Sequence, residues 1–209
     1  KGYHVLIYLT HEDPQKEISI MKLLQNGRVD GMLMSLSCDT KDMSHLEEMK
    51  TKEIPMVFFD RVAESVLAPQ VNTNDHECGF IGTEHLIKKG CKKIAFLSLP
   101  NHLSISNKRQ NGFLQAMHAH QYKKTDIITI TCDLNEKENR KKIQKLLKGK
   151  RRPDGIFASV EKLALTVYDV CQELQLRIPE DVKLLGFSNL HAANYLNPSL
   201  TTITQPAYE

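Results

Sequence analysis

Six polar residues follow the ends of predicted strands, the place where an open α/β sheet binds its ligands. Their side chains offer hydroxyl, amide and carboxylate groups that accept or donate hydrogen bonds, and one guanidinium with a rigid fork of donors. This chemistry suits the reversible binding of a small polar molecule. The candidate residues are Asp60, Asn74, Arg109, Glu161, Ser188 and Asn189.

Several of these candidates also have a simpler interpretation. Asp60 is followed by Arg61, and a local ion pair between the two would leave no ligand role for the carboxylate. Arg109 opens a predicted helix, where a surface arginine or a capping ion pair is the alternative to ligand binding. Ser188 and Asn189 favour turns in any protein. The sequence leaves these alternatives open.

The sequence contains no set of residues typical of a catalytic centre. The segment GFSN at 186–189 is not the GxSxG of a nucleophile elbow, and there is neither a GxGxxG nor a GxxxxGKS/T phosphate loop. His118 and His120 form one pair of potential metal ligands without a third partner nearby in the sequence. We therefore predict a protein that is not an enzyme and that needs no metal and no cofactor.

The composition is that of an ordinary globular protein. The chain has 209 residues, 41% hydrophobic and 25% charged, with a formal net charge of +3. This charge is too small to argue by itself for nucleic acid, and apolar residues at helical spacing assign the lysines of the basic segment 140–152 to the solvent face of a helix. No apolar run is long enough to span a membrane, and no signal peptide opens the chain. Five cysteines without a CxxC pair favour reduced thiols, so we expect a cytoplasmic protein.

Strands and helices alternate along the chain, which predicts an α/β fold with a doubly wound parallel sheet in each of two lobes. The apolar segment 3–9 is predicted to be a buried strand, followed by a helix that begins at Pro14 after the N-cap Asp13. Further strands are expected at 29–36, 56–59, 71–73, 94–97, 127–132, 155–159, 183–187 and 198–203. Pro100 interrupts the alternation. We predict a first lobe of residues 1–98, rejoined by 204–209, and a second lobe of residues 99–203.

A series of short segments forms a second pattern that extends along nearly the whole chain. The segments are GY (2–3), RVDGML (28–33), IPMVFFDR (54–61), VNTNDHECG (71–79), HLIKKG (85–90), KIAF (93–96), RQNGF (109–113), PDGIFA (153–158), IPEDV (178–182), GF (186–187) and LTTI (200–203). In this order and spacing, they resemble the ligand-sensing region of the lactose/galactose repressor (LacI/GalR) family of bacterial transcription regulators. Each segment alone is weakly specific, but their combination is highly specific.

The resemblance implies a periplasmic-binding-protein-like fold, a homodimer, and a sugar or sugar derivative held as effector in a cleft between two lobes. In the family, a helix-turn-helix headpiece binds operator DNA, and the effector acts by favouring one arrangement of the lobes. The family's headpiece, its first strand and helix and its closing helix and strand are not found, so we expect a fragment that contacts DNA only through the absent headpiece. A sugar-binding protein of a transport system has the same fold and is the alternative.

The resemblance also assigns effector positions, some of which depart from the common family pattern. The positions are Asp60 and Asn74 in the first lobe, and Arg109, Val160 and Ser188 in the second. The departures are Asn74-Asp75 in place of Asp-Asn, Val160-Glu161 in place of Asn-Asp, and Ser188 in place of the aspartate of Gly-Phe-Asp. The groups lost in this way usually hold sugar hydroxyls, whereas Arg109 is retained. The resemblance, with these departures, therefore leads us to expect an acidic or phosphorylated sugar as effector.

Overall fold

The computed structural model describes residues 2–25, 27–37, 40–100, 104–189 and 191–205. The chain folds into two compact units, and the main division between them lies at Asn72–Thr73. The first unit contains the residues up to Asn72, and the second contains nearly all of those that follow. Each unit is built on a parallel sheet, so the α/β fold class predicted from the alternating pattern is confirmed.

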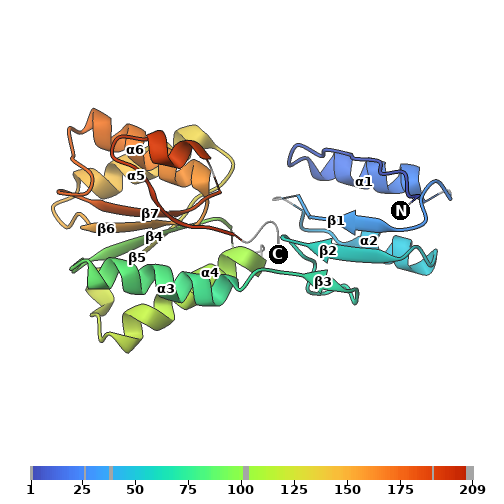
Figure 1. Ribbon diagram of the computed structural model, residues 1–209, viewed down its shortest axis with the longest axis horizontal. Helices are drawn as coiled ribbons and strands as arrows, with labels where there is room; N and C mark the ends of the chain where they lie inside the picture. Colours follow the sequence, from blue (N-terminus) through green and yellow to red (C-terminus); the bar gives the residue numbers. More distant parts are fainter. Residues whose placement is uncertain (1, 26, 38–39, 101–103, 190, 206–209) are drawn as a thin grey trace. The chain divides into compact units, whose positions relative to one another are not determined.

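The first unit has a three-stranded parallel sheet in the order β1-β2-β3 and two helices (Figure 1). The elements are α1 (Pro14–Leu24), β1 (Met32–Met34), α2 (Ser44–Thr51), β2 (Met56–Phe59) and β3 (Gln70–Val71). Helix α1 begins where the sequence predicts it, because the Asp13 carboxylate accepts hydrogen bonds from the backbone N–H groups of Gln15 and Lys16. Pro14 occupies the first helical position, where no backbone donor is needed.

The core of the first unit lies between its helices and one face of the sheet. Its buried residues include Met21, Leu46 and Met49 from the helices and Met34, Met56 and Phe58 from the strands. The other face of the sheet carries Leu33 and Val71, which are 75% and 66% exposed. Since side chains alternate between the two faces of a strand, one face packs and the other stays apolar but uncovered.

The segment 3–9 differs from the prediction of a buried strand. It forms no strand in the structure, and Tyr3 and Ile7 are 82% and 81% exposed. Its apolar and β-branched residues favour strand geometry, but a strand is stable only when its backbone groups pair with a neighbour. The segment pairs with none of the described strands of the first sheet. The prediction was therefore wrong for this segment.

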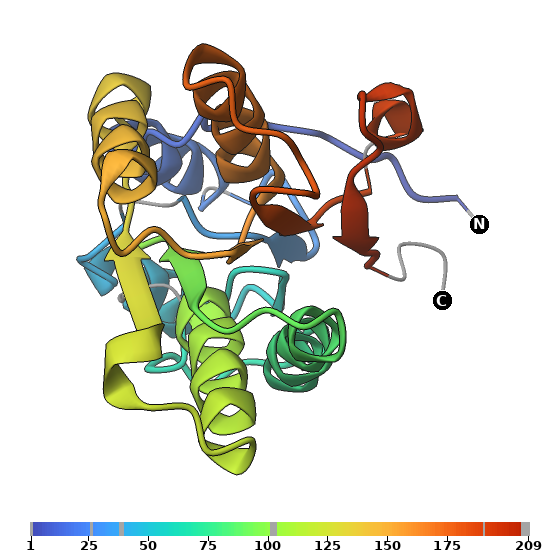
Figure 2. The ribbon, with the colours of Figure 1, turned by 90° about the vertical axis from the view of Figure 1, so that its left-hand side faces the viewer.

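The second unit has a five-stranded parallel sheet in the order β5-β4-β6-β7-β8. Its strands are β4 (Ile94–Ser98), β5 (Ile127–Thr131), β6 (Gly155–Ala158), β7 (Lys183–Phe187) and β8 (Thr201–Ile203). Its helices are α3 (Asp75–Lys88), α4 (Ser104–Ala119), α5 (Glu136–Lys148) and α6 (Glu161–Glu173), with short 3-10 helices at Lys124–Asp126 and His191–Tyr195. Figures 1 and 2 show α3 and α4 on one face of the sheet and α5 and α6 on the other.

Alternation along the central strands divides the core of the second unit into two layers. On the side of α3 and α4, Phe113 stacks on Phe96 with 5.1 Å between the ring centroids, and Phe157 stacks on Phe187 at 5.8 Å. On the side of α5 and α6, smaller residues of the same strands, such as Ala158, are buried. Because both faces are covered, the strands read as unbroken apolar runs in the sequence.

The division between the units differs from the predicted lobe boundary at residue 98. Strand β4 pairs with both β5 and β6, so it lies inside the second sheet, and α3 precedes it in the same unit. Asn74 therefore belongs to the second unit rather than to the first. At the other end, the chain is predicted to return to the first lobe at 204–209. Gln205 is instead hydrogen-bonded to Asn189 of the second unit, and residues 206–209 lie outside the described residues. Alternation predicts the elements of a fold, but not which strands pair.

The basic segment forms most of α5, as expected. Ile143 and Leu147 are buried on one side of this helix, while Lys142 reaches the carboxylate of Asp133 at the surface. The lysines of α5 therefore form its solvent face, as predicted. None of the helices in the described part of the chain combines the length and the apolarity needed to cross a membrane.

Three of the four cysteines that the structure describes are buried as small core residues. They are Cys91, Cys132 and Cys171, and burial raises the pKa of each thiol to about 11. Cys78 is only partly buried, and Cys38 lies outside the described residues. The raised pKa values indicate structural thiols, because a reactive cysteine needs an accessible thiolate.

We expect alkaline pH to destabilise the second unit through these thiols. Thiols of the unfolded chain ionise near pH ~8.5, whereas the folded chain keeps them protonated to about 11. Between these values the unfolded state binds fewer protons, so the free energy of unfolding falls as the pH rises. Urea denaturation at stepped pH measures this fall. The variant Cys171→Ala should lose stability less steeply, and an identical slope in both proteins would contradict the assignment.

Candidate functional site

Arg109 on α4 is the centre of a buried polar cluster at the carboxyl ends of β6 and β7. Its Nε donates to Asp75 Oδ1 at 2.7 Å, and its Nη1 donates to the carbonyl oxygen of Ser159 at 2.6 Å. The guanidinium also lies 3.8 Å from the centroid of the Phe187 ring. Arg109 is 3% exposed and Asp75 is 1% exposed. One side chain thus ties α4 to α3 and to the ends of two strands.

Two glycines bring α3 and α4 close enough for this contact. A Cβ atom on Gly79 would lie 2.2 Å from the carbonyl oxygen of Arg109, and a Cβ on Gly112 would lie 2.0 Å from that of His76. Each helix therefore presents a glycine to the backbone of the other. Asp75 lies one turn before Gly79 in α3, so the close crossing places its carboxylate against the guanidinium of Arg109.

A second polar contact joins Ser188, just after β7, to the start of α6. The hydroxyl of Ser188 donates to the carboxylate of Glu161, the first residue of α6. The backbone N–H of Ser188 donates to the carbonyl oxygen of Ile203 in β8 at 3.2 Å. Val160 is the N-cap residue of α6 and makes no side-chain cap. Ser188 and Glu161 together present a hydroxyl and a carboxylate at this edge of the sheet.

The two asparagines among the candidates make hydrogen bonds within the second unit. The side-chain amide of Asn189 exchanges two hydrogen bonds with the backbone of Gln205, at 3.0 and 2.8 Å. Asn74 donates to the Glu77 carboxylate at 2.7 Å and accepts from the thiol of Cys78 at 3.2 Å. Asn189 thus joins two segments of the second unit, and Asn74 lies at the start of α3.

In the first unit, Asp60 lies just after β2 with its backbone in the left-handed region at φ 57°. Its carboxylate lies 4.0 Å from Arg61 Nε, which is beyond hydrogen-bond distance, and its side chain is 43% exposed. The strong partner of Arg61 is Glu12, to whose carboxylate it donates twice, at 2.7 and 2.9 Å. An ion pair with Arg61 is therefore a weak alternative to a ligand-binding role for the Asp60 carboxylate. Aspartate tolerates the left-handed region better than most residues, so this backbone angle needs no ligand to explain it.

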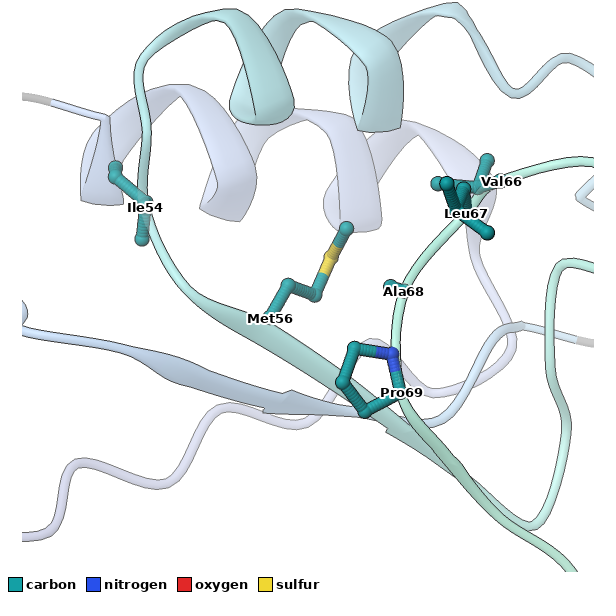
Figure 3. Close-up of a pocket in the computed structure, with 6 residues that line it drawn as sticks. All are labelled: Ile54, Met56, Val66, Leu67, Ala68 and Pro69. Carbon is teal, nitrogen blue, oxygen red and sulfur yellow. The ribbon is translucent and has the colours of Figure 1, made fainter.

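The first unit also has an apolar hollow of 160 Å³ (Figure 3). It is lined by Ile54, Met56, Val66, Leu67, Ala68 and Pro69. These residues precede or begin β2 and β3, so the hollow lies at the amino ends of these strands. Asp60 lies at the opposite, carboxyl end of β2. All the side chains that line the hollow are apolar, and it lies away from Asp60, so it is separate from the candidate site.

The structure also adds residues that the sequence candidates did not include. Asp75 and Phe187 contact the guanidinium of Arg109 directly. In the sequence, the only signal for them is that they are adjacent to the candidates Asn74 and Ser188. Among the described residues, no cluster of three potential metal ligands occurs. His120 of the pair noted in the sequence contacts Glu84 at 3.1 Å instead.

Residues 83–209 match the family described as periplasmic binding protein-like domain. The chain belongs to this family. Among curated proteins, the chain is 30% identical over 207 residues to the HTH-type transcriptional repressor PurR of Actinobacillus pleuropneumoniae serotype 3. This match covers 98% of the chain and 60% of that repressor. The chain is also 30% identical over 208 residues to the ribose operon repressor of Halalkalibacterium halodurans, covering 100% of the chain and 60% of that protein.

A solved structure extends the comparison to bound ligand. A LacI family transcriptional regulator from Enterococcus faecium, solved with bound ribose, is 26% identical and superposes with a TM-score of 0.79, covering 90% of this chain and 69% of that one. The resemblance to LacI-type regulators that the sequence segments indicate is thus confirmed. The chain spans about 60% of the length of the two curated relatives described above.

Proposed function

We propose that this chain is the effector-binding region of a transcription repressor, and that its effector is a neutral, hydroxyl-rich molecule of the size of a pentose. The effector would control the binding of operator DNA by a helix-turn-helix headpiece, in a protein that works as a cytoplasmic homodimer. Two repressors among the relatives and a related regulator with bound ribose support this assignment. The repressor relatives favour it over a sugar-binding protein of a transport system.

The observation that carries the choice of a neutral ligand is the pairing of Arg109. Its charge is matched by Asp75 at 2.7 Å inside the protein, while the carboxylate of Glu161 lies next to Ser188. Arg109, Asp75 and Glu161 together carry one positive and two negative charges. This edge of the second sheet therefore repels an anion and suits a molecule that donates hydroxyl hydrogens. These contacts support a neutral sugar rather than the acidic or phosphorylated one that the retained arginine suggested.

Calorimetric titration tests this proposal. We expect D-ribose to bind and D-ribose 5-phosphate to bind at least tenfold more weakly. Glu161→Gln should weaken ribose binding about tenfold, since a hydrogen bond to a charged acceptor is stronger than one to a neutral acceptor. Glu180→Gln, at an exposed carboxylate, is the matched control and should change nothing. Tighter binding of the phosphate ester than of ribose would overturn the neutral-ligand proposal.

A further inference from the structure

A buried carboxylate in the first unit holds together segments that meet near Asp60. Glu17 of α1 accepts a hydrogen bond from the backbone N–H of Ser37 at 2.7 Å and one from the hydroxyl of Thr40 at 3.0 Å. His45 Nε2 of α2 lies 3.0 Å from the same carboxylate. All four residues are buried. Glu17 therefore joins both helices of the unit to the segment that follows β1.

This network continues through the backbone to Asp60. Leu36, next to Ser37, donates its N–H to the carbonyl oxygen of Arg61 at 3.1 Å. Arg61 follows Asp60 directly, and the N–H of Asp60 donates to the carbonyl oxygen of Val71 at 3.2 Å. Asp60 is held on both sides in a left-handed conformation, which aspartate tolerates better than most non-glycine residues.

The hydrogen bonds of this network are satisfied at Glu17 but not at every atom. His45 Nδ1 is buried and has no hydrogen-bond partner among the described residues. Burial raises the pKa of Glu17, but hydrogen bonds from His45, Ser37 and Thr40 outweigh this effect and lower the pKa below the ordinary glutamate value. The carboxylate is therefore charged at neutral pH and holds its donors strongly.

We propose that Glu17 is a positioning residue that acts through Ser37, Leu36 and Arg61 to hold the Asp60 carboxylate in the orientation that binds effector. This inference rests on the proposed function and on Asp60 being the effector position of the first unit, as the family resemblance implies. Glu17 itself is 1% exposed, so it is not available for direct contact with an effector. Its effect on binding must therefore pass through Asp60.

The test compares Glu17→Gln with Met21→Ala, a matched control on the same helix. Met21 is a buried core residue outside the polar network. With D-ribose as the probe, Glu17→Gln should weaken binding about tenfold, a change of about 1.4 kcal/mol in binding free energy. Met21→Ala should lower the melting temperature and leave ribose affinity unchanged. Thr40→Val removes a single hydrogen bond and serves as a milder variant if Glu17→Gln does not fold.

A double-mutant cycle separates positioning from general destabilisation. If Glu17 acts through Asp60, Glu17→Gln should have almost no further effect on ribose affinity in an Asp60→Asn background. Additive losses, or unchanged ribose binding in Glu17→Gln, would overturn the inference. Hydrogen exchange gives a readout that needs no sugar: the amides of Leu36, Ser37 and Asp60 should exchange faster in Glu17→Gln than in wild type. Unchanged exchange would overturn the inference, whereas faster exchange without ribose binding by the wild type would contradict only the proposed effector.

Discussion

Gly112→Ala should destabilise the second unit by about 3 kcal/mol, because the new Cβ atom would lie 2.0 Å from the carbonyl oxygen of His76 and 2.7 Å from the backbone nitrogen of Phe80. Alanine favours a helix over glycine by about 1 kcal/mol, but this gain is too small to offset overlap with a backbone that cannot move alone. Gly79→Ala should act in the same way through the Arg109 carbonyl, which lies 2.2 Å from its Cβ position. Urea denaturation measures both losses.

Gly149→Ala is the matched control for these variants. Its Cβ would meet no atom closer than 3.5 Å, and its backbone has an ordinary φ of −68°. We expect a change in stability within about 0.5 kcal/mol at this position. If Gly112→Ala were equally harmless, α3 and α4 would not be in the close contact described here, and the placement of Asp75 against Arg109 would lose its explanation.

Arg109→Met should cost about 3–5 kcal/mol of stability, because it leaves the carboxylate of Asp75 buried without its cation. The double variant Arg109→Met with Asp75→Asn should recover part of this loss, since no uncompensated charge remains. Urea denaturation of the single and double variants gives the coupling between the two residues directly. A large coupling energy is expected, because Asp75 balances the charge of Arg109 inside the protein.

An exposed pair supplies the control for Arg109. Arg140 of α5 contacts Glu173 of α6 at the surface, where solvent and salt screen the charges. Arg140→Met should therefore cost less than about 1 kcal/mol. Equal losses in Arg109→Met and Arg140→Met would show that the Asp75 carboxylate is not buried with its partner, and the argument for a neutral effector would fall with it.

The local pattern of the chain was enough to predict the α/β class and most strands of the second unit. Strands covered on both faces must be apolar throughout, so the segments that became β4, β6 and β7 were recognisable without any tertiary information. The start of α1 at Pro14 was equally local, because a cap needs only residues next to the helix. The ordered series of family segments identified the LacI-type resemblance in the same way.

Three features were decided only by the tertiary structure. The unit boundary depends on β4 pairing with β5 and β6, and strand order is not encoded in local periodicity. The segment 3–9 has a strand composition but no partner strand among the described residues, and a strand cannot satisfy its backbone alone. The partner of Arg109 is Asp75, which is distant in sequence and reaches it because two glycines let their helices approach. The sequence by itself determined which groups were available for binding, and long-range packing decided which of them neutralise one another, because charge pairing depends on distance in space.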